Sequence, residues 1–120
     1  MTLRALTLVT AVSLLAAPGA GFAQGTKERL SEADILIVIR SHSKPLRECV
    51  TEQKRRNPSL GGTLRIQWTI QPNGKTRSVG AAPEQFRSTY LASCVVGLVK
   101  GWNFPPHRVQ GEAVDLPITF

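Results

Sequence analysis

The chain has 120 residues, 42% of them hydrophobic and 19% charged, and 15 Lys and Arg against 8 Asp and Glu give it a net charge of +7. This composition excludes a disordered or fibrous chain. The length suits one domain, and two cysteines are too few for a disulfide-dense miniprotein or a four-cysteine zinc site.

The first 23 residues have the pattern of a secretory signal peptide. Arg4 supplies a positive charge, Ala5 to Ala17 form an uncharged apolar run, and Gly21-Phe22-Ala23 places small residues at a cleavage site. The alternative is a membrane anchor, but the run is shorter than the roughly 20 apolar residues that a span needs. We therefore expect cleavage before Gln24, which leaves an exported domain of residues 24–120 without a membrane span.

A helix is expected after Ser31, because Ser31 and Asp34 have the S-x-x-D form of a capping box. Pro45 removes a backbone donor and is expected to kink this helix or split it in two. Asn57-Pro58 ends the segment. Residues at steps of three and four form its apolar stripe: Ile35, Val38, His42, Leu46, Cys49 and Val50.

A β-hairpin follows the first helix. Between Leu64 and Ile70, apolar residues alternate with polar ones, which is typical of a strand with one buried face. Pro72-Asn73-Gly74 predicts a turn, of type I′ because Asn-Gly tolerates positive φ angles. Lys75 to Ala81 then returns as a second, more polar strand.

A second helix is expected from Glu84 to Lys100, and a third strand at the C-terminus, where Val114 to Phe120 again alternate. Pro117 makes that strand an edge strand, since proline cannot donate to ladders on both sides. The element order α-β-β-α-β predicts an α+β fold. Its three-stranded sheet, antiparallel or mixed, has strand order 2-1-3 and carries the helices on its apolar face.

Cys49 and Cys94 lie on the apolar faces of the two expected helices. Outside the cytoplasm a pair of cysteines more often forms a disulfide than stays as free thiols, so we expect a bridge that pins the helices together. A catalytic thiol or half of a metal site is the alternative, although no His or Asp stands at ligand spacing from either cysteine.

Several motifs occur in the order of a known family. Asn57-Pro-Ser-Leu-Gly-Gly62 precedes the amphipathic strand and its Asn73-Gly74 turn. Cys94-Val95 is followed by Trp102-Asn-Phe-Pro-Pro106 and by the closing Leu116-Pro-Ile-Thr-Phe120. Together they resemble the AgmX/PglI-type C-terminal domain, a relative of the TonB C-terminal domain, over roughly residues 35–120.

The resemblance implies a non-catalytic interaction module of the cell envelope, periplasmic or secreted. AgmX-type domains are associated with gliding motility and envelope machinery. In TonB the domain adds a strand from an outer-membrane receptor to its sheet. Within these 120 residues there is no long Pro-rich spacer of the TonB kind, so we expect binding without energy transduction.

The C-terminal edge strand is the candidate docking site, because an exposed edge offers unpaired backbone groups to a partner. The expected partner is an envelope protein or peptide that adds a strand. A second copy of the chain is the alternative, which would give a homodimer. The candidate residues are Val114, Asp115, Leu116, Pro117, Ile118 and Thr119.

Basic residues on the first helix support a second hypothesis, a surface for anionic lipid headgroups or acidic glycans. A solvated helix face is the simpler interpretation. Nucleic acid is not an expected partner, because interleaved aromatic residues are missing. The residues concerned are Lys44, Arg47, Lys54, Arg55 and Arg56.

Neither catalysis nor a metal or cofactor is expected, because no nucleophile elbow, phosphate loop or paired carboxylates are visible. His42 lies on the apolar stripe and suits the core or its boundary, whereas His107 is expected to be exposed in the connector before the last strand. Trp68 and Trp102 are expected to pack in the core rather than to anchor a partner.

Overall fold

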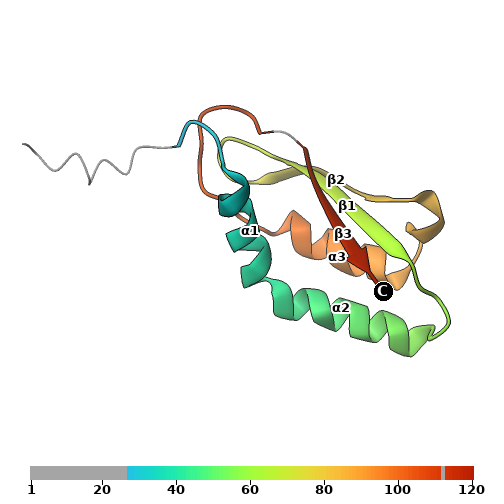
Figure 1. Ribbon diagram of the computed structural model, residues 1–120. Coiled ribbons are helices and arrows are strands. Elements are labelled where there is room, and N and C mark those ends of the chain that lie inside the picture. The colour runs from blue at the N-terminus through green and yellow to red at the C-terminus, as the bar shows by residue number, and fades with distance from the viewer. Residues whose placement is uncertain (1–26, 112) are drawn as a thin grey trace, which may run out of the picture.

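A computed structural model describes residues 27–111 and 113–120 (Figure 1). The expected signal peptide, residues 1–23, and its cleavage site before Gln24 lie outside the described residues. Both strand pairings are antiparallel and the sheet order is β2-β1-β3, which confirms the predicted α+β fold. The elements in chain order are α1 (Glu32–Ser41), α2 (Ser43–Arg56), β1 (Thr63–Ile70), β2 (Thr76–Ala82), the short 3₁₀ helix η2 (Glu84–Phe86), α3 (Tyr90–Lys100) and β3 (Ala113–Thr119).

The first helical segment begins at the expected capping box and is split in two. The Asp34 amide donates to the Ser31 hydroxyl at 3.1 Å, and the Ser31 amide donates to the Asp34 carboxylate at 2.9 Å. The two helices meet at His42, three residues before Pro45. Proline lacks the N–H that would bond the carbonyl four residues earlier, and its ring crowds that carbonyl. The carbonyl here belongs to Ser41, so the helix breaks just after that residue.

The turn between β1 and β2 differs from the predicted type I′. The Gly74 amide donates to the Gln71 carbonyl and the Gln71 amide to the Lys75 carbonyl, both at 2.8 Å. Within Gln71–Lys75, all described, Gly74 alone has a positive φ, +86°. A type I′ turn would require a positive φ at Asn73 as well, so that prediction is wrong. The ring of Pro72 instead favours a type I turn, and Gly74 forms the bulge that follows it.

The second helix starts later than predicted, at Tyr90 rather than Glu84. Glu84–Phe86 form a separate 3₁₀ turn, and Thr89 has an extended backbone (φ −74°, ψ 154°). The Thr89 hydroxyl accepts a hydrogen bond from the Ala92 amide at 3.1 Å. Such a side-chain cap marks the first turn of a helix, which explains why the helix begins at Tyr90.

The core lies between the sheet and α3, and Figure 1 shows how these two layers are arranged. The side chains of β1 that face the helices are buried, and the connector after α3 adds two aromatic rings. Trp68 packs edge-on against Trp102, with ring centroids 5.7 Å apart, and both indoles are buried as expected. The other main members of the core are Leu64, Ile66, Ile70, Leu91, Val95, Val99 and Phe104.

The two histidines have different surroundings. His42 is half-buried and stacks on Trp102 with ring centroids 4.6 Å apart, in agreement with its place on the apolar stripe. His107 is only 3% exposed, so the prediction of an exposed side chain is wrong. The connector folds back onto the hairpin, where the His107 amide donates to the Pro72 carbonyl at 2.9 Å. This contact buries the ring.

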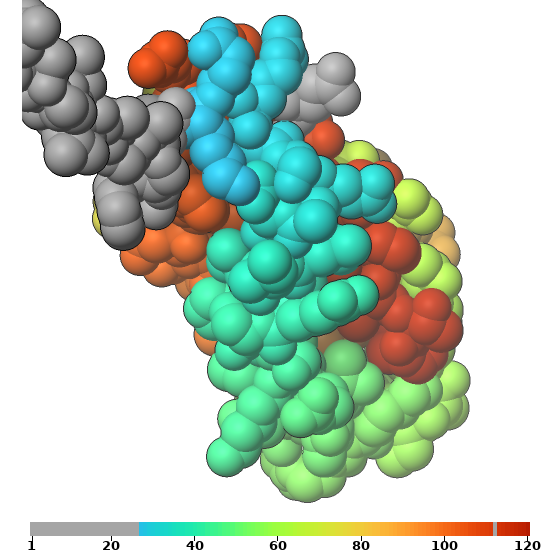
Figure 2. Space-filling view, turned by 60° about the vertical axis from the view of Figure 1, so that its left-hand side comes forward, coloured from blue at the N-terminus to red at the C-terminus, as the bar shows by residue number. Residues whose placement is uncertain are grey.

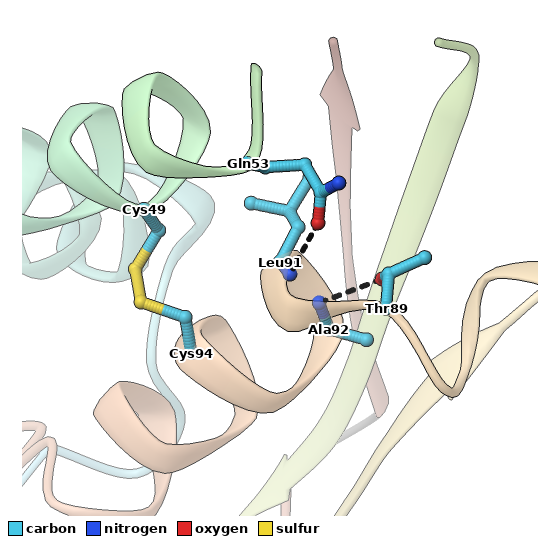
Figure 3. The surroundings of a disulfide bond; sticks show 6 residues. All are labelled: Cys49, Gln53, Thr89, Leu91, Ala92 and Cys94. Atoms are coloured by element: carbon cyan, nitrogen blue, oxygen red, sulfur yellow. Dashed lines mark hydrogen bonds between the residues drawn. A yellow bond between two sulfur atoms is a disulfide. The ribbon is translucent and has the colours of Figure 1, made fainter. Parts of the chain in front are cut away.

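A disulfide joins Cys49 of α2 to Cys94 of α3, as predicted (Figure 3). One turn beyond Cys49, the buried Gln53 side chain accepts a hydrogen bond from the Leu91 amide at 2.9 Å. Figure 3 shows Gln53 reaching from α2 to the start of α3, beside the Thr89 cap. The two helices are therefore linked both covalently and by a buried hydrogen bond.

Candidate functional site

All six predicted docking residues lie in β3, which forms one edge of the sheet. Its pairing with β1 runs without a shift from Thr63↔Thr119 to Thr69↔Ala113. Among residues 27–111 and 113–120, no strand pairs with the other side of β3. The seven-residue strand is therefore a regular edge with one unpaired side.

The hydrogen-bonding direction of each β3 residue follows from the strand's last contact. Gly62 and Phe120 exchange both of their backbone hydrogen bonds, each 2.9 Å long. Because bonded and non-bonded pairs alternate along an antiparallel ladder, Ile118, Leu116 and Val114 also direct their backbone groups to β1. The residues between them direct their N–H and C=O groups toward the unpaired side.

Pro117 is one of these outward-directed residues, since it lies opposite Arg65 between two bonded pairs. The N–H that proline lacks therefore removes no hydrogen bond from the β1–β3 ladder. On the unpaired side, Asp115 and Thr119 offer both a donor and an acceptor, whereas Pro117 offers its carbonyl alone. The edge has a gap in its row of donors at this position.

The side chains of β3 leave the core partly open. Val114, Leu116 and Ile118 face the helices, yet all three are only half-buried. Their partners on β1, which lie one strand further inside, are at most 1% exposed: Trp68, Ile66 and Leu64. Apolar surface thus continues past the sheet to its unpaired side.

A cavity of about 340 Å³ lies beside the start of β3. It extends between the first turn of α1 and the end of β1, and Figure 2 shows β3 exposed beside the two N-terminal helices. Its lining includes the apolar residues Leu30, Ile35, Ile70 and Val114 and the charged residues Arg29 and Glu32.

The opposite face of β3 is polar. The Arg65 guanidinium binds the Asp115 carboxylate through two nitrogens, at 2.7 and 3.0 Å. The hydroxyl oxygens of Thr63 and Thr119 lie 3.5 Å apart. An ion pair this exposed contributes little stability, so it serves mainly to orient Asp115. One face of β3 is apolar and the other carries charge and hydroxyls.

The other edge of the sheet, formed by β2, is less regular. Its register with β1 shifts between Gln67 and Thr69, and Ser78 has a positive φ of +55°. A bulge of this kind twists a strand and interrupts its row of backbone groups. Natural proteins use such bulges to blunt sheet edges, so β3 is the better template for an added strand.

The basic residues of the second hypothesis do not form one free surface. The Lys54 ammonium donates to the Leu60 carbonyl at 2.7 Å. Arg55 and Arg56 both bind Glu52, at 2.6 and 3.1 Å, and their hydrogen bonds lower the pKa of Glu52 to about 2. Arg56 also stacks 3.9 Å from the centre of the Tyr90 ring. The remaining two, Lys44 and Arg47, are exposed on α2.

The sequence interpretation did not single out Arg65, Leu30 or Ile35 for the site. Arg65 reaches Asp115 only because of the β1–β3 register, and strand periodicity alone leaves that register undefined. Leu30 and Ile35 join the cavity through the packing of α1, which no local pattern reveals.

In the part of the chain that the structure describes, no group of three or more His, Cys, Asp or Glu side chains is placed to hold a metal ion. The same residues contain no helix of the length and hydropathy that crossing a bilayer requires.

Comparison with known proteins gives one curated relative. The chain is 28% identical over 87 residues to the tyrosine-protein kinase MasK of Myxococcus xanthus (strain DK1622). The matched stretch covers 72% of this chain but only 13% of MasK. No family model and no solved structure matches the chain. Neither an H-R-D nor a D-F-G sequence, which kinase catalysis uses, occurs in the 120 residues.

Proposed function

We propose that this protein is an exported interaction module of the cell envelope, of the AgmX/PglI and TonB C-terminal-like type, that docks a partner by strand addition to β3. The observation that carries the proposal is the regular, unpaired β3 edge with half-buried Val114, Leu116 and Ile118 beside it. A fourth strand would satisfy the outward backbone groups and cover these side chains together.

The two faces of β3 define the chemistry of the partner strand. Side chains of an added strand would alternate between the apolar side, near the cavity lined by Ile35 and Val114, and the polar side, near Asp115. A partner segment with apolar residues at every second position fits both faces. Pro117 has no N–H to donate, so one backbone carbonyl of the partner strand stays without a hydrogen bond at this position. A partner residue that tolerates this unpaired carbonyl is favoured there.

Two further observations support the envelope assignment. Disulfides such as Cys49–Cys94 persist in oxidising compartments, among them the bacterial periplasm. The similarity to one stretch of a Myxococcus xanthus protein is compatible with an AgmX-type domain. Because that stretch is 13% of MasK, the name of that protein does not carry kinase activity to this chain.

The decisive experiment exploits the hydrogen-bonding direction of Thr119, whose N–H points away from β1. Thr119→Pro removes one outward donor and leaves the β1–β3 ladder intact, whereas Thr119→Ala keeps the donor and removes the same hydroxyl. Immobilised wild-type protein and both variants are exposed to envelope extract at high salt, which suppresses binding through surface charge. We expect wild type and Thr119→Ala to retain the same protein and Thr119→Pro to retain about tenfold less.

Retention of that protein by Thr119→Pro at the wild-type level would exclude strand addition at β3. A homodimer is recognised separately, by sedimentation of the purified protein over a range of concentrations. If β3 pairs with a second copy, Thr119→Pro shifts the monomer–dimer equilibrium toward monomer, and the immobilised wild-type protein retains no other protein from the extract. Such a result would replace the envelope partner with a second copy of the chain.

A further inference from the structure

The α1 helix leaves large apolar side chains in solvent. Ile37 is 65% exposed and Leu36 is 37% exposed, and α1 contributes no fully buried residue to the core. A single exposed aliphatic side chain is ordinary, but here two neighbours share one turn. Figure 2 shows α1 and α2 running down the front of the molecule, with no later segment of the chain across them.

Three exposed cations follow Leu36 and Ile37 along α1 and α2. Arg40 follows Leu36 by four residues and Ile37 by three, which places it on the same side of α1. Arg40, Lys44 and Arg47 are all exposed. Within residues 27–111 and 113–120, no carboxylate forms an ion pair with any of them. We call Leu36, Ile37, Arg40, Lys44 and Arg47 the outer ridge.

We propose that the outer ridge docks on the surface of an anionic phospholipid bilayer. Aliphatic side chains of one helical turn enter the boundary between headgroups and acyl chains, while neighbouring Lys and Arg bind lipid phosphates. The outer ridge has both parts side by side. This site is separate from the β3 edge, and it differs from the predicted basic face because Lys54, Arg55 and Arg56 are engaged within the protein.

A second copy of the chain is a poorer occupant of the outer ridge. An isologous contact would gather Arg40, Lys44 and Arg47 of both copies in one interface. Like charges held together in this way oppose association. Two exposed carboxylates lie near the outer ridge, Glu48 on α2 and Glu32 one turn before Leu36 on α1. They leave an excess of positive charge beside the three cations. Charge complementarity therefore favours an anionic surface.

The test is co-sedimentation with vesicles of phosphatidylcholine alone or mixed with phosphatidylglycerol, at physiological salt. The full chain is used in the form in which expressing cells produce it, with its N-terminus determined by mass spectrometry. The charge variant Arg40→Gln/Lys44→Gln is matched by Arg77→Gln/Lys100→Gln, which removes the same charge from exposed positions outside α1 and α2. We expect the ridge variant to bind anionic vesicles about 25-fold more weakly, at about fivefold for each cation, and the matched variant much less so.

The apolar part of the outer ridge is tested with Leu36→Ser/Ile37→Ser. We expect about tenfold weaker vesicle binding and only a small loss of thermal stability, because neither side chain belongs to the buried core. A tryptophan at position 37 (Ile37→Trp) should be quenched by lipids with brominated acyl chains, and one at position 77 (Arg77→Trp) should not.

Three results would overturn the proposal. The first is equal loss of binding in the two charge variants, since net charge alone would then explain it. The second is an affinity for dextran sulfate equal to that for anionic vesicles and unchanged in Leu36→Ser/Ile37→Ser. That result would indicate a general affinity for polyanions. The third is no binding to anionic vesicles above the level seen with phosphatidylcholine alone.

Discussion

The Gln53 side chain of α2 accepts a buried hydrogen bond from the Leu91 backbone amide at the start of α3, with an oxygen–nitrogen distance of 2.9 Å. The first amides of a helix have no partner within the helix. Thr89 satisfies one of them within the same segment, and Gln53 satisfies another from a different helix. A residue distant in sequence thus completes the cap of α3.

Replacing Gln53 by alanine should destabilise the fold by about 1–3 kcal/mol, because the Leu91 amide would stay buried without a partner. Urea denaturation monitored by tryptophan fluorescence measures the difference. Gln67→Ala is the matched control, since Gln67 is exposed on β1. An equal midpoint for the two variants would mean that the hydrogen bond contributes nothing.

Removal of the disulfide should cost about 4 kcal/mol in the chain-entropy model, because the bridge closes a loop with a sequence separation of 45. The variant Cys49→Ser/Cys94→Ser is compared with wild type by urea denaturation, with and without dithiothreitol. The reductant should lower the stability of wild type and leave that of the double variant unchanged. A smaller loss would indicate that the reduced, unfolded chain retains structure near the helices.

Two glycine substitutions should act in opposite directions. A Cβ at Gly74 would collide with the Phe104 carbonyl oxygen, and Gly74 has a positive φ, so Gly74→Ala should destabilise by more than about 1 kcal/mol. Gly97 is exposed in α3 with nothing within 4 Å of its would-be Cβ, so Gly97→Ala should stabilise by about 0.5–1 kcal/mol. Thermal unfolding measures both changes: the midpoint should fall in Gly74→Ala and rise in Gly97→Ala, each relative to wild type.

Amide hydrogen exchange should alternate along β3. The amides of Leu116 and Ile118 bond to β1 and should exchange slowly, whereas those of Asp115 and Thr119 point outward and should exchange quickly in the unbound monomer. Heteronuclear NMR resolves the individual residues. Slow exchange of Asp115 and Thr119 that depends on protein concentration would reveal pairing between copies.

Acid should weaken the cap of α1 through Asp34. The hydrogen bonds from Lys27 and Ser31 lower the pKa of this carboxyl from 3.8 to about 2. A carboxyl with a lowered pKa stabilises the fold above its unfolded pKa, and the stabilisation disappears as pH falls through the folded value. Stability should therefore decrease between about pH 4 and pH 2, and less steeply in Asp34→Asn.

NMR titration checks this assignment directly. In Lys27→Ala the pKa of Asp34 should rise toward its usual value and remain below it, because the Ser31 hydrogen bonds persist. If the pKa of Asp34 is the same in wild type and Lys27→Ala, the Lys27 ammonium group is not the main cause of the lowered pKa.

Local patterns were sufficient to predict most of the fold. The strict alternation from Leu64 to Ile70 and the capping box at Ser31 each specify one structure, and both are confirmed. Two failed predictions have different causes. His107 is buried where the connector packs on the hairpin loop, a contact between segments distant in sequence. The helix starts at Tyr90 because of the local cap at Thr89, which the helical spacing of the apolar residues did not reveal.

The candidate site shows the same division. Pro117 indicated from the sequence that the last strand lies at an edge. The direction of its missing donor, the Arg65–Asp115 ion pair and the cavity beside Val114 depend on register and packing. A single sequence carries no signal for these, because a shift of one residue in the pairing would exchange the two faces of the strand.

The outward position of Pro117 also affects how the protein behaves without a partner. A long, regular strand edge with alternating apolar residues is a template on which further chains can join into a continuous sheet and aggregate. The proline ring breaks the row of donors near its centre, as gatekeeper residues do, and it does so without weakening the domain. The residue that would interrupt pairing with the proposed partner strand therefore also opposes the joining of further copies of the chain to the unoccupied edge.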